Sequence, residues 1–290
     1  MCYKYTYELI NILILYIGNV KLKKLRGINT MKKQFKIIVM FLSFALLLAA
    51  CGKSNETSSD SSKNDKVLKM ATSADFKPFE SRDKEGNIVG FDIDLANLIA
   101  DELGYKLEIQ DMNFDGLIGA LQSKRVDMVM AGMSTTEKRK KNVDFSKEYH
   151  RSGEMFLSLP DKKIESLESL EGKTVGVQLG TIQEEGANEL SKKYGFTVKP
   201  VDNAGVLIQE LLSNRVDAVY MDSVVAVGYR DEQGLFGFDD PTTSSPGMAI
   251  AFPKGSDLVD DVNKALDKLE KEGKIKELKE KWKLDQVAIE

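Results

Sequence analysis

Two segments of the sequence, 117–130 and 207–220, repeat each other at a distance of 90 residues. They agree at eight of fourteen positions. A shared helix–turn–strand pattern explains the matching leucines and valines, but it explains the matching Ser, Arg and Asp less easily. The sequence therefore predicts two lobes built from one module.

Each copy of the repeat belongs to a longer alternation of short apolar runs and amphipathic segments. Between Ile93 and Leu103, for example, apolar side chains recur at the three- and four-residue spacing that is typical of a helix. We predict strands at 67–71, 106–109, 126–130, 174–177, 197–201 and 216–220, and helices at 92–103, 114–122, 184–193 and 204–212. Such alternation favours parallel sheets covered by helices, so the predicted fold class is α/β.

A later strand at 247–252 and two helices at 258–271 and 275–282 follow the second alternation. Since the first lobe has only three strands up to Met130, we expect this late segment to return and complete it. The division is then 66–157 plus 247–290 for lobe 1 and 158–246 for lobe 2. Two hinge crossings are expected, near 157–160 and 243–247.

The first 65 residues read as processing and tethering segments. Residues 31–50 have a Lys-rich start, an apolar core and a small-residue end, as a secretory signal peptide does. A transmembrane helix fits less well, because the apolar run is shorter than the ~20 residues a bilayer needs. Leu48-Ala-Ala-Cys51 resembles a bacterial lipobox, which implies that Cys51 carries lipid in the mature protein. Residues 51–65 lack the apolar side chains for a core and are expected to be a flexible tether, and 1–30 an extension from an upstream start.

The composition of the mature part argues against several classes of function. Residues 51–290 hold 33 basic and 44 acidic residues, a balance of −11, so a basic nucleic-acid footprint is not expected. Apart from Cys51 the only cysteine is Cys2, and His150 is the only histidine. Cysteine-based metal sites and Ser-His catalysis therefore lose their support. We expect no cofactor and no metal, and a monomer.

A candidate binding site lies where the strand of the first repeat ends. Gly132 and Ser134 follow this strand, and a charged segment ends at Arg139. Backbone N–H groups at a helix start, with one guanidinium nearby, can bind a carboxylate or a phosphate. The alternative is an ordinary strand with a Ser/Thr N-cap and a solvated basic helix.

The second copy of the repeat ends at Asp222, which can supply a fixed anion for an ammonium group. Ligands of parallel sheets collect at the carboxyl ends of the strands, so Arg139 and Asp222 are expected to face one cleft. Phe76 and Phe114 offer flat apolar faces for an aliphatic stem or a guanidinium. Singly, the arginine can be a surface charge, the aspartate an N-cap and the phenylalanines core residues. Together they match a zwitterion.

The segment from Gly90 to Leu103, Gly-Phe-Asp-Ile-Asp-Leu-Ala-Asn-Leu-Ile-Ala-Asp-Glu-Leu, resembles the signature of solute-binding proteins of polar amino-acid ABC transporters. The similarity extends from about Val67 to Leu284. It implies a two-lobed periplasmic-binding-protein-like fold of type II, with Arg139, Ser134 and Thr181 on the ligand carboxylate and Asp222 on its ammonium. The ligand-binding set implied or expected here is Ser73, Phe76, Phe114, Gly132, Met133, Ser134, Arg139, Gln178, Thr181 and Asp222.

Within this family, Ser73 departs from the aspartate that several binders of basic residues or glutamine carry, which leaves open the partner of the ligand's distal group. Gln178 can hydrogen-bond a guanidinium or an amide, and the segment 176–185 looks most like arginine-type binders. We expect arginine first, then other basic or amide-bearing residues. The predicted protein is extracytoplasmic, lipid-anchored to the cell membrane and partnered by an ABC permease. An enzyme of the same two-lobed family and a signalling input module are the rival classes.

Overall fold

The first of two five-stranded sheets has the strand order β5-β1-β6-β13-β7 in the computed structural model, which describes residues 66–242 and 245–284. β5, β1 and β6 run parallel, whereas β13 is antiparallel to both of its neighbours. The three strands predicted up to Met130 are parallel as expected, and the late strand returns to this sheet in the antiparallel direction, so the sheet is mixed. The strands are β1 (Lys66–Thr72), β5 (Tyr105–Asp111), β6 (Met128–Val129), β7 (Val143–His150) and β13 (Met248–Pro253).

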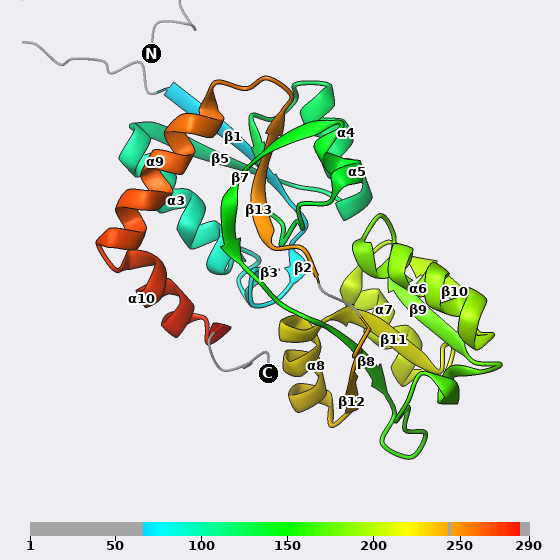
Figure 1. Cartoon of the computed structure of the whole chain (residues 1–290). Helices are drawn as coiled ribbons and strands as arrows, with labels where there is room; N and C mark the ends of the chain where they lie inside the picture. Colours follow the sequence, from blue (N-terminus) through cyan, green and yellow to red (C-terminus); the bar gives the residue numbers. More distant parts are fainter. Residues whose placement is uncertain (1–65, 243–244, 285–290) are drawn as a thin grey trace, which may run out of the picture. The chain divides into compact units, whose positions relative to one another are not determined.

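Amphipathic helices cover this sheet (Figure 1). In α9, the buried side chains Val262, Ala265, Leu266 and Leu269 recur every three or four residues, so one apolar stripe faces inward. The helices and single turns of this part are α3 (Phe91–Leu103), η1 (Phe114–Gly116), α4 (Leu117–Gln122), α5 (Glu137–Lys140), α9 (Leu258–Lys271) and α10 (Lys274–Lys281). We call this sheet and its helices lobe 1.

The second sheet has the order β10-β9-β11-β8-β12 and is also mixed. β10, β9 and β11 are parallel, while β8 runs antiparallel to β11 and β12. Its elements are β8 (Glu154–Ser158), η2 (Glu168–Leu170), β9 (Thr174–Gln178), α6 (Ile182–Tyr194), β10 (Thr197–Val201), α7 (Ala204–Leu212), β11 (Ala218–Asp222), α8 (Ser223–Gln233) and β12 (Phe236–Asp239). We call this sheet and its helices lobe 2. The two repeated segments thus occupy equivalent places, as α4 with β6 and as α7 with β11.

The chain passes between the lobes twice. The first passage, 151–153, links β7 to β8, and the second lies between β12 and β13 (Figure 1). The passages begin and end next to each other, because His150 pairs with Met248 in the first sheet and the Glu154 carbonyl accepts a hydrogen bond from Asp240 in the second. The expected first crossing near 157–160 is therefore misplaced: Glu154–Ser158 already pairs with β11.

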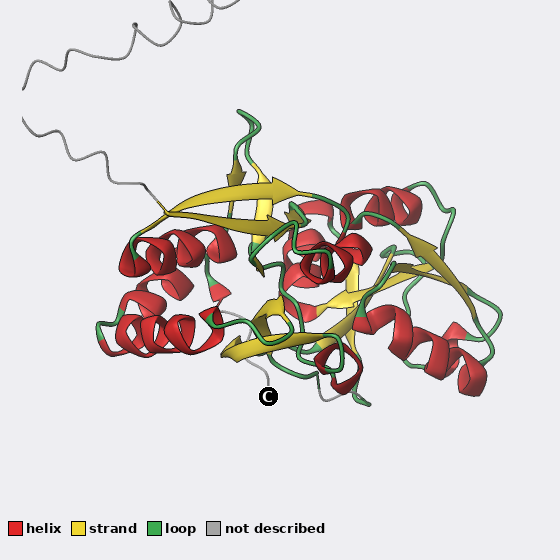
Figure 2. Ribbon diagram, turned by 90° about the horizontal axis from the view of Figure 1, so that it is seen from above, coloured by secondary structure: helices red, strands yellow, loops and turns green. Residues whose placement is uncertain are grey.

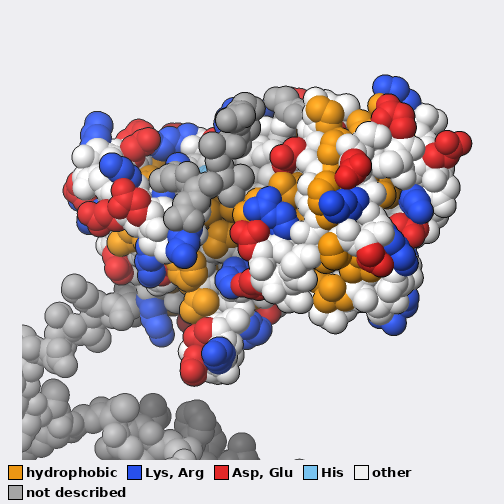
Figure 3. Space-filling view, turned by 90° about the horizontal axis from the view of Figure 1, so that it is seen from below, with side chains coloured by type: hydrophobic (Ala, Val, Ile, Leu, Met, Phe, Trp, Pro, Cys, Tyr) orange, Lys and Arg blue, Asp and Glu red, His pale blue; other side chains and the backbone are white. Residues whose placement is uncertain are grey.

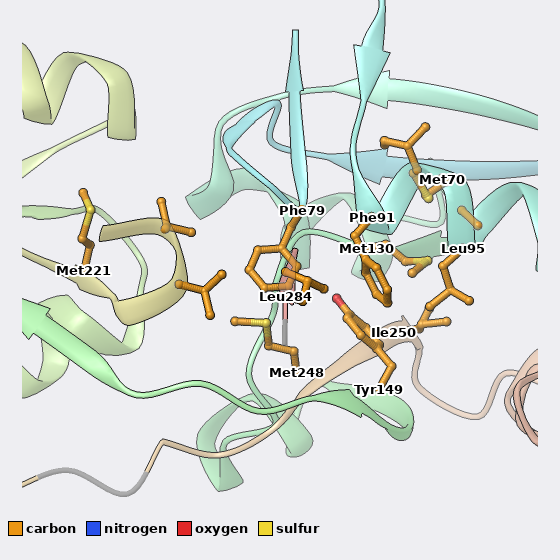
Figure 4. Packing of buried hydrophobic residues seen from close by; sticks show 14 of the residues in the cluster. Met70, Phe79, Phe91, Leu95, Met130, Tyr149, Met221, Met248, Ile250 and Leu284 are labelled. Carbon is orange, nitrogen blue, oxygen red and sulfur yellow. The ribbon is translucent and has the colours of Figure 1, made fainter. Parts of the chain in front are cut away.

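A small antiparallel sheet extends from lobe 1 toward the other lobe. It consists of β2 (Asp75–Phe76), β3 (Glu80–Arg82) and β4 (Ile88–Val89). Beneath it, Phe79, Phe91 and Tyr149 pack together with Met248, whereas Met221 lies apart in lobe 2 (Figure 4). This sheet places Asp75, Phe76 and Glu80 at the edge of lobe 1.

The predicted elements are present, and the structure adds strands β2, β3, β4, β7, β8 and β12 and helix α8. Figure 2 shows the helices and strands of the described residues from above. The predicted signal peptide, the lipidated Cys51, the tether and the extension 1–30 lie outside the described residues. Within 66–242 and 245–284, no helix is both long enough and apolar enough to cross a membrane.

Candidate functional site

One cavity lies where the carboxyl ends of β1 and β6 in lobe 1 meet those of β9 and β11 in lobe 2. Both lobes supply side chains to its wall. Nine of the ten residues predicted to bind ligand line it: Ser73, Phe76, Phe114, Gly132, Ser134, Arg139, Gln178, Thr181 and Asp222. The structure therefore brings together residues that are up to 149 positions apart in the sequence.

Arg139 is held inside this cavity and is not a surface charge. The residue is only 7% exposed. One guanidinium nitrogen donates to the Ser134 carbonyl at 2.9 Å, and the other donates to the Gly180 carbonyl of lobe 2 at 3.0 Å. Burial lowers the pKa of Arg139 to about 10, which still leaves it cationic at neutral pH. Because five N–H donors are available, two carbonyl contacts leave donors for a carboxylate.

The predicted helix start before Arg139 is only the four-residue α5, capped by the Thr136 side chain. A helix this short has a weak dipole, so the anion site here depends on the guanidinium itself. A longer helix, α6, begins at the opposite wall. Thr181 is its N-cap, accepting from the Glu184 amide at 3.1 Å, and lines the cavity.

The two phenylalanines that were predicted to enclose the ligand, Phe76 and Phe114, both line the cavity. The Arg139 guanidinium carbon lies 5.3 Å from the centroid of the Phe114 ring, at cation–π distance. Phe76 packs against the backbone of Gly132, which has a φ of 55°. A Cβ atom at Gly132 would lie 2.7 Å from the Phe76 ring. The absence of a side chain at Gly132 therefore lets the aromatic ring approach.

Asp222 ends β11 and caps α8. Its carboxylate accepts from the amides of Val224 at 2.9 Å and Val225 at 3.3 Å, and the residue is 2% exposed. Burial raises the pKa of Asp222 to about 7, although the hydrogen bonds to the carboxylate act in the opposite direction. Asp222 is thus the N-cap of α8 and also lines the cavity, and its role as a partner for an ammonium stays a prediction.

Two further carboxyl groups in the wall were not in the predicted binding set. Glu80 is fully buried, and its carboxyl lies within hydrogen-bond reach of the Asp92 carboxyl, while no neutral or cationic donor reaches it within the described residues. Burial, with the nearby Asp92 carboxyl, holds the pKa of Glu80 well above its ordinary value. Asp75 accepts from the Gln178 side chain of lobe 2 at 3.1 Å. Nothing in the local sequence of Glu80 signals its burial, because that burial depends on β3 being covered by α3 and Phe79.

The remaining predicted residues differ in placement. Ser73 donates to Asp75 at 3.0 Å, so its hydroxyl supports another carboxylate in the wall. Met133 does not reach the cavity: its side chain is fully buried in the apolar cluster with Leu117 and Val129. The prediction that Met133 lies in the binding set is therefore not supported by its side-chain position. Gln183, Ile182, Ala131 and Met248 line the cavity without having been predicted to bind ligand.

The lobes are closed over this cavity. Besides Arg139 with Gly180, Lys138 of lobe 1 pairs with Glu185 of α6 at 2.6 Å. The space open to the centre of a water-sized sphere is about 20 Å³, which is room for one or two water molecules. A molecule larger than a few water molecules can therefore enter only when the lobes move apart.

Comparison with known protein families identifies the family to which the chain belongs. The family of bacterial extracellular solute-binding proteins, family 3, matches residues 68–285. The chain belongs to this family.

Relatives within family 3 support the assignment along nearly the whole chain. The arginine-binding extracellular protein ArtP of Bacillus subtilis (strain 168) is 46% identical over 253 residues, which is 86% of this chain and 98% of ArtP. A solved structure, an ancestral arginine-binding protein bound to arginine, has a TM-score of 0.71 and 44% identity, covering 74% of this chain and 97% of that one.

A second solved structure among these neighbours is an ancestral amino acid-binding protein described as a precursor of cyclohexadienyl dehydratase. It has a TM-score of 0.70 and 39% identity, covering 74% of this chain and 95% of that one. The two-lobed, type II periplasmic-binding-protein fold of family 3 is thus shown for this chain, with two hinge passages.

Proposed function

We propose that this protein binds an L-amino acid with a cationic side chain, arginine first, and delivers it to an ABC permease. The observation that carries the proposal is the sign and placement of the charges in the cavity wall. One cation, Arg139, faces the cleft together with the carboxyl groups of Asp75, Glu80 and Asp222. A zwitterion with a cationic side chain has one carboxylate and two cations. Arg139 complements the carboxylate, and Asp222 and Glu80 complement the cations, since Asp75 already accepts from Gln178 and Ala204 of lobe 2.

The two ends of the α-amino acid are assigned first. Arg139 would hold the α-carboxylate with its free N–H donors, together with Ser134 and Thr181 beside it. Asp222, from the other lobe, would hold the α-ammonium. Because these groups belong to different lobes, a bound zwitterion would link the lobes and favour the closed form.

The next assignment is the protein group that binds the cationic end of the ligand's side chain. The partner of the ligand's side chain, left open by Ser73, would be Glu80, whose buried carboxyl lines the cavity beside Asp92. A cationic group that reaches this carboxyl would favour its ionised form and gain affinity by pairing with it. Phe76 and Phe114 would enclose the aliphatic stem, and Gln178 would stand beside Asp75 at the edge. Two of the similar proteins are named for arginine binding, which supports the same choice.

Differential scanning fluorimetry of the purified protein against the twenty standard L-amino acids tests this function. A ligand that binds only the folded state stabilises the protein and so raises its melting temperature. At a free ligand concentration of a hundred times Kd, the stabilisation is ~2.7 kcal/mol. We expect the largest rise with arginine and smaller rises with other basic or amide-bearing residues. No rise with any amino acid would contradict the proposal.

Binding rather than catalysis is the second part of the proposal. Buried carboxyl groups with raised pKa values are also the groups that act as general acids, and one similar structure is described as a precursor of a dehydratase. We infer that the bound amino acid leaves unchanged. Recovery of arginine in full, by mass spectrometry after long incubation with the protein, is the expected result, and conversion to another product would favour the enzyme.

Location at the membrane is the third part. We propose an extracytoplasmic protein anchored through lipid on Cys51, after removal of residues 1–50. Intact-mass analysis of the protein from its host should give a species that starts at Cys51 and carries acyl groups. A species that retains residues 1–20 would contradict both the processing and the upstream-start interpretation.

A further inference from the structure

Glu154 and Asp222 form a carboxyl pair at the hinge end of lobe 2. They are direct partners in the antiparallel register of β8 and β11. Residues directly opposite each other in such a pair point to the same face of the sheet, with Cβ atoms about 5 Å apart. Both are buried, with exposed fractions of 4% for Glu154 and 2% for Asp222. Two acidic side chains therefore share one dry face of the sheet.

Glu154 does not line the cavity but is connected to it. One of its carboxyl oxygens accepts from the Gln183 side chain at 2.6 Å, and Gln183 lines the cavity. The other oxygen, Oε1, has no hydrogen-bond partner within the described residues. A buried oxygen without a partner is costly in a carboxylate, and a proton shared with a neighbouring carboxyl lowers that cost.

The groups that face this pair are neutral or acidic. From α6 comes Gln183, and from the end of β12 comes the carboxyl of Asp240, which accepts from Tyr220 and Thr242. The start of α8 contributes the amides that Asp222 caps, and Ser152 and Ser245 contribute hydroxyl groups. In the described part of the chain, no Lys, Arg or His is among the groups that shift the pKa of either carboxyl.

The pKa values agree with this geometry. Burial, and then the charge of Asp222, raise the pKa of Glu154 to about 8, and burial raises that of Asp222 to about 7. Two interacting carboxyl groups lose their protons in two steps, whose pKa values belong to the pair rather than to either residue. The ligand-free pair is therefore partly protonated at neutral pH.

We propose that Glu154 and Asp222 share a proton in the ligand-free protein, and that the α-ammonium of a bound amino acid displaces this proton to solvent. The ammonium keeps its three protons, and the pair releases one, so charge and atoms balance. Glu154 is then a positioning residue for binding: it makes ammonium recognition at Asp222 depend on pH without touching the ligand. The proposal rests on the proposed function only in requiring a ligand with an α-ammonium.

Glu154 also lies at the hinge, next to both passages between the lobes. It is the first residue of β8, directly after the passage 151–153, and its carbonyl accepts from Asp240 next to the second passage. Closure over the ligand removes water from this end of the cavity. The proton therefore leaves before or during closure, when the pair still has access to solvent.

Calorimetry with L-arginine tests the proton release. Titrations at pH 7 in buffers of different ionisation enthalpy should show release of about half a proton or more per ligand, and the affinity should fall by up to about tenfold per pH unit between pH 8 and 6. In Glu154→Gln, the release should shrink and the pH profile should flatten. The exposed Glu165→Gln, in the same lobe, should behave as the wild type.

Carboxyl ¹³C NMR of the ligand-free protein supplies a readout that needs no ligand. Glu154 and Asp222 should titrate near neutrality, and Asp222 should titrate at lower pH in Glu154→Gln. Titration of both below pH 5 in the wild type, or a proton release that Glu154→Gln leaves unchanged, would overturn the proposal. Failure of every amino acid to bind, with the carboxyl titration as expected, would instead overturn the proposed function and with it the displacement step.

Discussion

Asp75 of lobe 1 accepts a hydrogen bond from the backbone amide of Ala204, the first residue of α7 in lobe 2, at 2.8 Å. The same carboxylate oxygen accepts from the Gln178 side chain of lobe 2 at 3.1 Å. A negative charge at a helix N-terminus is favourable, because the amides there lack partners in the helix. Asp75 therefore fastens the closed lobes at the edge of the cavity.

Replacing Asp75 should shift the ligand-free protein toward an open form. Asp75→Ala removes the acceptor for both lobe 2 donors, and Asp75→Asn keeps an acceptor without the charge. We expect a larger radius of gyration by small-angle X-ray scattering and about fivefold weaker arginine binding for Asp75→Ala, since a hydrogen bond is worth about 1 kcal/mol net. Asp75→Asn should lie between this variant and the wild type.

The exposed Asp101→Ala, on α3 of the same lobe, is the matched control and should change neither quantity. An unchanged radius and affinity in Asp75→Ala would mean that the contact with α7 does not hold the lobes together.

Replacing Arg139 should weaken arginine binding far more than replacing its neighbour Lys138. Removing one partner of a buried, hydrogen-bonded charge pair costs about 3–5 kcal/mol, so Arg139→Ala should weaken binding by at least about a hundredfold. Arg139→Lys should recover little, since an ammonium lacks the planar fork that spans two carbonyls, a carboxylate and the Phe114 face. Isothermal titration calorimetry measures both.

Lys138→Ala provides the comparison for Arg139. Its ammonium pairs with Glu185, but its side chain is 76% exposed. Exposed ion pairs contribute little to stability. Acidic and basic side chains are interspersed over the face shown in Figure 3. We expect less than about a threefold change, and an equal loss in both variants would remove the special role of the guanidinium.

Glu80 should decide between charged and neutral ligands. Glu80→Gln removes the acidic partner proposed for the distal cation, so arginine affinity should fall by about tenfold or more while glutamine affinity changes little or rises. The ligand-free variant should melt at a higher temperature, since the amide can donate to the buried Asp92 carboxyl and removes the repulsion between two adjacent acidic groups. Glu85→Gln, in the exposed loop after β3, controls for charge. Retained arginine preference in Glu80→Gln would show that another group binds the side chain.

The sequence predicted those parts of the fold and site that depend on local pattern. The repeat identified two equivalent modules, and strand-end positions identified Arg139 and Asp222 as neighbours in one cleft. Strand β7 was missed although Val143, Phe145 and Tyr149 alternate with polar residues, and β8 was missed because its start follows the polar passage 151–153.

The acidic groups of the site depended on tertiary burial. A carboxyl such as Glu80 or Glu154 looks solvated in the sequence, since acidic side chains are rarely buried. Only the strand pairing of β8 with β11 places Glu154 opposite Asp222, and only the covering of β3 removes Glu80 from water. Met133 shows the converse, because strand-end position alone does not decide whether a side chain turns toward the cleft or the core.

Gly132 should tolerate no side chain. Its φ of 55° is unfavourable for other residues, and a Cβ would also lie 2.7 Å from Phe76. Gly132→Ala should therefore lower the melting temperature and weaken arginine binding by moving the aromatic wall. Gly86→Ala separates the two causes, since Gly86 has a φ of 87° but nothing within 4 Å of an added Cβ. It should cost only the backbone strain of about 1 kcal/mol, without affecting binding.

The stability of the ligand-free protein should fall as the pH rises from about 5 to 8. Burial raises the pKa of Asp92 to about 6, of Asp222 to about 7 and of Glu154 to about 8, whereas in the unfolded chain these groups ionise near pH 4. Between these limits the folded state holds more protons than the unfolded state, so the free energy of unfolding decreases with increasing pH. Exposed carboxyl groups with lowered pKa values, such as Glu137, act only below this window. Melting temperatures should therefore decline toward pH 8, by about 2–4 °C per kcal/mol lost, and Glu154→Gln should reduce the decline. A melting temperature that rises over the same range would show that these carboxyl groups are already ionised in the folded protein.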